Sequence, residues 1–344
     1  MTRYLRLFVM ALVSGLMLSG CHSIPEYENT AKGNFDLLWT IFDEHYCFFE
    51  EAGVDWDAVY DKYSPRVEAC RTNRELFDLC AEMINELRDG HVNLSSSFAT
   101  SYYKKWWSDY PQNYDWRVIN ENYLYFNGQQ IGAFTYAILP QNVGYISLPT
   151  FAQGIGEGNL DNILSYLAIT NGLIIDVRDN GGGDMTNVET WVSRFITGRT
   201  LAGSIRHKTG KGHNDFSEPY EYYYSPPGDG HIQWGKPVVI LTNRSTFSAA
   251  NNFVSIMRLL PGVTQIGDVT GGGCGMPLSF ELPSGWGVRL SACPVSDAEG
   301  NLTEFGLAPH IAVDITPAAI AAGRDPILDR AIALISRGTG PSIP

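Results

Sequence analysis

Apolar residues in the first part of the chain recur at three- and four-residue steps, the spacing of amphipathic helices. One helix is expected with Asn34 as its cap, a second after Asp55, and a third after the capping box "TNRE" at 72–75. An Asp-Gly pair follows the third helix and is typical of a helix stop. The pattern therefore predicts a small helical N-terminal unit over residues 27–95.

The pattern changes after this unit. Residues 96–142 form a connecting segment rich in aromatic and polar residues, with short strand-like pieces such as "YLYFNG" at 123–128. From residue 143 onward, apolar runs of strand length alternate with helical patterns. These runs are "VGYISL", "GLIIDV", "PVVILT" and "VTQIGD". Buried strands that alternate with helices predict an α/β layered core over residues 143–335.

The N-terminus has the three-part layout of a secretory signal. Two arginines precede the apolar run "LFVMALVSGLML" at 7–18, which is too short to span a membrane comfortably, and "LSGC" ends at Cys21. "LSGC" resembles a bacterial lipobox, which implies cleavage before Cys21 and lipidation of that cysteine. The alternative is an ordinary signal peptide with a chance cysteine. We expect residues 1–21 to be a lipoprotein signal, and the body to be exported to the periplasm or cell surface and tethered to a membrane.

The net charge of −13 makes a nucleic-acid backbone an unfavourable partner. No group of cysteines and histidines has zinc-ligand spacing, so neither a metal nor a cofactor is expected. Cys274 and Cys293 flank the hairpin pattern "PLSFELPSGWGVRLSA". Counting outward from its turn places them almost opposite each other, so an exported protein can bridge them. Alternatively, all the cysteines after Cys21 are buried apolar residues, and no pairing is predicted for the other three, Cys47, Cys70 and Cys80.

"GLIIDVRDNGGGD" at 172–184 combines a buried strand with three consecutive glycines. Glycines leave backbone N–H groups uncovered, so such a loop can stabilise a phosphate or an oxyanion. The stretch lacks the Gly-Lys-Ser/Thr of a P-loop and the GxGxxG spacing of a dinucleotide site. From the residues alone, a tight turn between strand and helix explains it equally well.

A second buried strand, "PVVILT", leads to Ser245 and Ser248. A helix is expected to begin at or just after Ser248, so this serine is either a helix cap or a nucleophile in the positive field of a helix N-terminus. Parallel neighbouring strands would bring it and the glycine loop to the same edge of the sheet. A nucleophilic serine needs a base, and His91 stands at the joint between a helix stop and a strand in "RDGHVNL".

Six motifs appear in order across residues 89–313. They are "DGHV", "GYISLPTF", "GLIIDVRDNGGG", "PVVILTNRSTFSAANNF", "GDVTGGG" and "EFGLAPHIAV". Together they resemble the serine peptidases that include C-terminal processing proteases and the tricorn core. The resemblance implies a ClpP/crotonase-like core and a cofactor-independent serine endopeptidase that acts on exported peptides or unfolded proteins.

Two catalytic arrangements occur among these peptidases, and the sequence distinguishes them. "VTGGGC" at 269–274 holds no lysine, which excludes the Ser/Lys arrangement. The tricorn-like arrangement implies that Ser248 is the nucleophile, that His91 is its base, and that Glu304 in "EFGLAPH" orients the base. It also implies an oxyanion hole built from the N–H groups of Gly182 and Ala249.

The chain departs from the tricorn-like pattern at three positions: Asn251 and His310 replace the usual acidic residues, and Gly90 replaces a serine. The interval from 94 to 143 is too short for the PDZ domain of many relatives. The aromatic stretch at 101–116 forms either a wall of the cleft or ordinary packing.

Two other functions are compatible with parts of the sequence. The first is a non-catalytic protein that binds peptides or apolar ligands on a peptidase scaffold. The second is a crotonase-type acyl-CoA enzyme, which fits poorly with export. The oligomeric state is left open.

Overall fold

The computed structural model describes residues 27–336. Cys21 and the predicted signal peptide lie outside the described residues. Within residues 27–336, none of the helices has the length and apolar character that crossing a membrane requires.

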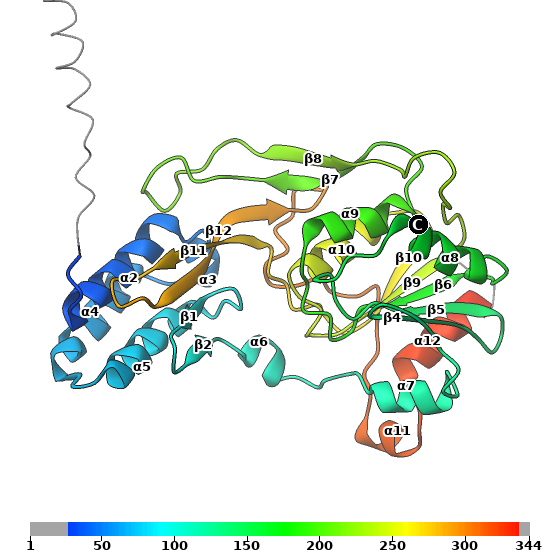
Figure 1. The fold of residues 1–344 in the computed structure, drawn as a ribbon, viewed down its shortest axis with the longest axis horizontal. Coiled ribbons are helices and arrows are strands. Elements are labelled where there is room, and N and C mark those ends of the chain that lie inside the picture. The colour runs from blue at the N-terminus through cyan, green and yellow to red at the C-terminus, as the bar shows by residue number, and fades with distance from the viewer. Residues whose placement is uncertain (1–26, 337–344) are drawn as a thin grey trace, which may run out of the picture.

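A seven-stranded sheet forms the centre of the larger part of the molecule, with the order β13-β10-β9-β6-β5-β4-β3 (Figure 1). The five strands from β13 to β5 in this order pair in parallel. Strands β4 and β3 are added at the β5 edge in antiparallel orientation. The strands are β3 (Gln129–Ile131), β4 (Phe134–Leu139), β5 (Val143–Ser147), β6 (Leu173–Asp176), β9 (Val238–Thr242), β10 (Val263–Gly267) and β13 (Ile311–Ala312).

Helices cover both faces of this sheet, which explains why its strands are apolar throughout. Leu173 and Ile175 of β6 pack in one core, whereas Ile174 between them packs in the core on the opposite face. The first face carries α8 (Glu157–Leu167), α9 (Met185–Ser193) and α10 (Ala249–Met257), and the second carries α7 (Trp116–Asn122) and α12 (Pro326–Ser336). The short helix α11 (Pro317–Ala321) precedes α12. The predicted α/β layered core is therefore confirmed.

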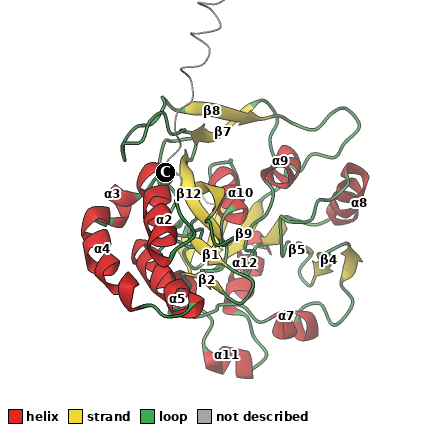
Figure 2. Cartoon of the chain, turned by 60° about the vertical axis from the view of Figure 1, so that its left-hand side comes forward, coloured by secondary structure: helices red, strands yellow, loops and turns green. Residues whose placement is uncertain are grey.

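A second, six-stranded sheet connects this core to the N-terminal helices (Figure 2). Its strands are β1 (Asn93–Ser95), β2 (Thr100–Tyr102), β7 (Thr200–Ile205), β8 (Tyr220–Tyr224), β11 (Gly275–Glu281) and β12 (Gly287–Ser296). The hairpin β11–β12 packs its apolar side chains into the same core as the N-terminal helices. Those helices are α2 (Ala31–His45), α3 (Phe49–Ala52), α4 (Trp56–Tyr63) and α5 (Asn73–Ile84), with 3-10 turns at Ser64–Ala69 and Asn85–Leu87.

The units in space therefore differ from the predicted segments. The hairpin at 275–296, which the sequence assigned to the core, completes the N-terminal unit. Strands β3 and β4, which lie in the predicted connecting segment, extend the seven-stranded sheet instead. Between the two units, that segment carries only β2, the short helix α6 (Lys105–Ser108) and α7 before it reaches β3.

Several local predictions can be compared directly with the structure. The capping box at 72–75 and the Asp55 cap are confirmed. Asn34 was wrongly expected to be a cap, because Thr30 accepts the Gly33 N–H and starts α2 one turn earlier. The piece at 123–128 is a turn rather than a strand, with left-handed backbone at Tyr125 and Phe126.

Candidate active site

Ser248 lies between the end of β9 and the first residue of α10, in a backbone conformation that a non-glycine residue rarely adopts. Its φ is 57° and its ψ is −124°. Two loops hold it there. The Ser248 N–H donates to the Gly272 carbonyl at 2.8 Å, and a Cβ at Gly182 would lie 2.8 Å from that of Ser248. Strain of this kind persists where the surroundings enforce it, and it is found at nucleophiles on strand-to-helix turns.

Ser248 Oγ lies 3.1 Å from Nε2 of His91, although 157 positions separate the two residues in the sequence. His91 follows the 3-10 turn at Asn85–Leu87 and precedes β1, and it is buried. The predicted joint between helix stop and strand thus delivers this imidazole to the nucleophile. The distance is within hydrogen-bond reach of a general base.

Burial lowers the pKa of His91 to about 4. The Asp89 carboxylate opposes this shift, and the Arg289 guanidinium adds to it. His91 is consequently neutral at pH 7, and a neutral imidazole is the form that can accept a proton from a serine hydroxyl.

The Asp89 carboxylate holds the backbone around His91. One oxygen accepts the His91 N–H at 2.6 Å, and the other accepts the Ser291 hydroxyl of β12 at 2.7 Å. Asp89 was not predicted as a site residue from the sequence. The motif "DGHV" does indicate its role, because an Asp side chain often accepts the backbone N–H two residues further on in a turn.

Glu304 is buried and lines a cavity together with Asp89, but among the described residues the predicted hydrogen bond between Glu304 and His91 is not formed. Glu304 Oε2 instead accepts the Gly275 N–H at 3.0 Å. Nδ1 of His91 is buried and has no hydrogen-bond partner among the described residues. Burial and the nearby Asp89 carboxylate raise the pKa of Glu304 well above its ordinary value, so the orienting role of Glu304 stays a prediction.

The two predicted oxyanion donors differ in availability. The N–H of Ala249, the first residue of α10, has no acceptor among the described residues, whereas that of Gly182 already donates to Asn180 Oδ1 at 2.9 Å. The N–H of Gly183, one residue further on, also has no acceptor in the described part of the chain. Gly183, Ser248 and Ala249 line one cavity of about 380 Å³. The structure therefore favours Gly183 over Gly182 as the second donor.

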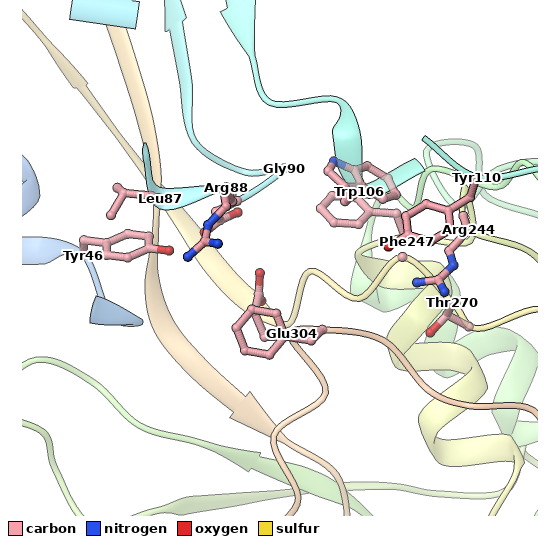
Figure 3. Close-up of a pocket in the computed structure, with 13 residues that line it drawn as sticks. Tyr46, Leu87, Arg88, Gly90, Trp106, Tyr110, Arg244, Phe247, Thr270 and Glu304 are labelled. Carbon is pink, nitrogen blue, oxygen red and sulfur yellow. The ribbon is translucent and has the colours of Figure 1, made fainter. Parts of the chain in front are cut away.

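A second cavity, of about 250 Å³, is shown in Figure 3. Asp89, Gly90 and Glu304 line it together with Trp106 and Phe247. Asp89 and Glu304 thus line a different cavity from the one that His91 and Ser248 line.

The two acidic-to-neutral departures from the tricorn-like pattern have structural explanations. Asn251 is fully buried, donates to Thr303 and accepts from Thr270 Oγ1 at 2.6 Å. It thereby ties α10 to the loops that precede Glu304. His310 accepts the Gln265 N–H at 3.0 Å through Nδ1, and neither residue lines the cavity at Ser248.

The expected Cys274–Cys293 disulfide is not formed, since the five cysteines among the described residues are all free. A register shift in the β11–β12 hairpin between Met276 and Pro277 explains the error. Beyond it, Cys293 lies opposite Met276, and Val295 donates to the Cys274 carbonyl. Counting outward from the turn assumed an uninterrupted ladder, and the bulge breaks that assumption.

Within residues 27–336, no group of three or more potential ligands is arranged to hold a metal ion.

The fold and this site define a peptidase scaffold with a serine–histidine pair, and comparisons with known proteins specify the family. The model of Peptidase family S41 matches residues 142–313, and the Tricorn protease C1 domain model matches 27–85. A solved structure described as a peptidase from Parabacteroides merdae is 46% identical, with a TM-score of 0.85 over 90% of this chain and 97% of that chain. The protein belongs to peptidase family S41, a family of serine peptidases.

Two further relatives place the chain within this fold. Tricorn protease homolog 2 of Streptomyces coelicolor is 27% identical over 198 residues, which are 56% of this chain and only 15% of that protein. The structure of mature CPAF in complex with lactacystin is 11% identical, with a TM-score of 0.69 over 90% of this chain and 99% of that one. The latter similarity concerns the fold, and it confirms the ClpP-like core.

Proposed function

We propose that this protein is a serine endopeptidase that cleaves peptide bonds through an acyl-enzyme. The observation that carries the proposal is the 3.1 Å contact between His91 and a Ser248 held in a strained turn. The N–H group of Ala249, which has no acceptor among the described residues, supports it, because a peptidase needs such donors where negative charge develops.

In the proposed reaction, Ser248 Oγ attacks the scissile carbonyl carbon and its proton passes to Nε2 of His91. The carbonyl oxygen becomes an oxyanion between the N–H groups of Ala249 and Gly183. The C–N bond then breaks, and the leaving amine takes the proton from His91. A water molecule, deprotonated by His91, hydrolyses the acyl-enzyme and restores Ser248.

The cavity at Ser248 suggests which substrate side chains fit beside the cleaved bond. Met185 comes from α9, Met276 and Pro277 come from β11, and Val295 comes from β12. An apolar side chain buried here gains hydrophobic free energy, whereas a charged one loses hydration. We therefore propose peptides or unfolded proteins with apolar residues at this position as substrates.

The cellular setting is a further part of the proposal. The layout of residues 1–21 supports export and a lipid anchor on Cys21 in a bacterial membrane, with the body in the periplasm or at the cell surface. The substrates would then be exported peptides or proteins.

A fluorophosphonate probe tests the proposed nucleophile. The wild-type protein should form one covalent adduct that maps to Ser248, and Ser248→Ala should abolish labelling. Ser245→Ala is the matched control, since Ser245 lies in the same turn but does not line the cavity at Ser248. Labelling that survives Ser248→Ala would refute the assignment.

One observation favours a second function, a non-catalytic peptide-binding protein. Nδ1 of His91 has no hydrogen-bond partner among the described residues, and Glu304 accepts the Gly275 N–H instead, so the expected His91–Glu304 bond of the triad is not formed there. A binding protein would retain apolar peptides without cleaving them and would leave the probe unreacted.

A further inference from the structure

Three aromatic rings form a continuous column that ends at the imidazole of His91. Trp106 of α6 stacks on Phe247, with ring centroids 4.4 Å apart and 25° between the ring planes. Phe247 in turn contacts His91, with centroids 4.7 Å apart. Figure 3 shows Trp106 lying against Phe247 at the cavity of about 250 Å³. Since Phe247 directly precedes Ser248, the column borders both the base and the nucleophile.

The column fits because three glycines leave room for it. A Cβ at Gly90 would lie 2.7 Å from Nε1 of Trp106, and one at Gly271 would lie 2.3 Å from its six-membered ring. A Cβ at Gly273 would lie 2.3 Å from the ring of Phe247. Such distances are too short for real side-chain atoms, so Trp106 occupies a slot that these glycines open.

The imidazole of His91 has few other restraints. Asp89 bonds its backbone, and Ser248 Oγ contacts Nε2, but Nδ1 has no hydrogen-bond partner in the described structure. In a serine–histidine pair, a bond to Nδ1 ordinarily fixes the ring orientation. Without that bond, the orientation depends on packing, and Phe247, which is tilted by 51° to the imidazole and backed by Trp106, packs against the ring.

We propose that Trp106 is a positioning residue, which acts through Phe247 to hold the His91 imidazole against Ser248 and to keep water from its side. The inference rests on the proposed peptidase function. The aromatic segment at 101–116 then has a specific part in the active site, because it delivers this ring.

Variants of Trp106 test the proposal through the rate of fluorophosphonate labelling. Trp106→Ala should label at least about tenfold more slowly, since small misplacements of a catalytic group reduce rates by one to two orders of magnitude. Trp106→Phe keeps a stacking ring and should stay within about threefold of wild type. Trp107→Ala is the matched control, because Trp107 is the next residue on α6, is more exposed, and lines neither cavity described above. It should label like the wild type.

The pH dependence separates positioning from a general loss of stability. The charged groups that act on His91 are Asp89 and Arg289, with Glu304 beyond Asp89, and Trp106→Ala leaves all three in place. Removing the indole admits water, so the pKa of His91 should rise from about 4 toward its ordinary value. The pH at which labelling is half-maximal should rise with it, and Trp106→Phe should restore the wild-type midpoint.

Trp106→Ala that labels at the wild-type rate with an unchanged pH midpoint would overturn the inference. If Trp106→Ala does not fold, as judged by its thermal unfolding, Trp106→Leu replaces it. If the wild-type protein does not label at all, the proposed function fails, and NMR titration of His91 decides the inference by itself. An imidazole pKa that is the same in the wild type and the variant would then contradict it.

Discussion

The nucleophile and its base belong to two differently built regions of the molecule. Ser248, Gly183 and Ala249 follow strands of the parallel sheet, and loops after β6, β9 and β10 fix the serine backbone in a strained conformation. His91 belongs to the N-terminal unit and is held through Asp89 and the second sheet. The nucleophile is thus restrained from several sides, whereas the base depends on how the two regions pack together.

The largest expected effect is that of removing the base. His91→Ala should slow fluorophosphonate labelling by about 10²–10⁴-fold, which is the usual contribution of general base catalysis. The proper measurement is the second-order rate of adduct formation at pH 7, followed by mass spectrometry. A rate for His91→Ala within threefold of wild type would mean that the contact with Ser248 has no catalytic role.

The restraint on the nucleophile can be broken from the core side with one methyl group. Gly182 has a φ of +96°, and its Cβ would lie 2.7 Å from the Phe247 carbonyl and 2.8 Å from the Ala249 nitrogen. Gly182→Ala should therefore cost about 1–3 kcal/mol of stability and slow labelling at least about tenfold. Chemical denaturation and the labelling rate measure these effects.

Gly181→Ala is the matched control for that change. A Cβ at Gly181 would meet nothing within 4 Å, so this variant should match the wild type in stability and rate. An equal loss of stability and labelling rate in Gly181→Ala and Gly182→Ala would show that any side chain in the glycine loop has this effect. It would contradict the explanation by a specific contact between Gly182 and the Ser248 turn.

A smaller effect is expected from Asp89→Asn on the side of the base. The amide can still accept the His91 N–H, but the negative charge that raises the pKa of His91 is lost. That pKa should fall below about 4. Because the neutral imidazole is the active form, labelling should persist to lower pH than in the wild type, the opposite of the shift expected for Trp106→Ala. A midpoint that moves upward would contradict the assigned effect of the Asp89 charge.

The two regions also differ in how much of their structure could be predicted from the sequence. The parallel sheet and the Ser248 turn follow from local signals, namely continuous apolar runs and a serine before a helix. The predicted meeting of the glycine loop with that turn is confirmed by the contact of Gly182 with Ser248. Local pattern is sufficient there because each strand is buried on both faces.

The other features depend on details of backbone and packing that the pattern of apolar and polar residues does not reveal. The bulge that moves Cys274 away from Cys293 is not detected by counting residues outward from the turn of the hairpin. The preference for Gly183 over Gly182 depends on a single hydrogen bond, which the Gly182 N–H donates to Asn180 Oδ1. The position of Trp106 follows from space left by glycines in two separate loops, and no residue next to it indicates this.

A crystal structure of the fluorophosphonate adduct tests the central claim most directly. The account predicts a phosphorus atom bonded to Ser248 Oγ, with one phosphoryl oxygen accepting the N–H groups of Ala249 and Gly183. It also predicts that His91 stays beside the adduct and that the Gly182 N–H still donates to Asn180. An adduct on another side chain, or a phosphoryl oxygen that points away from the Ala249 N–H, would contradict the account.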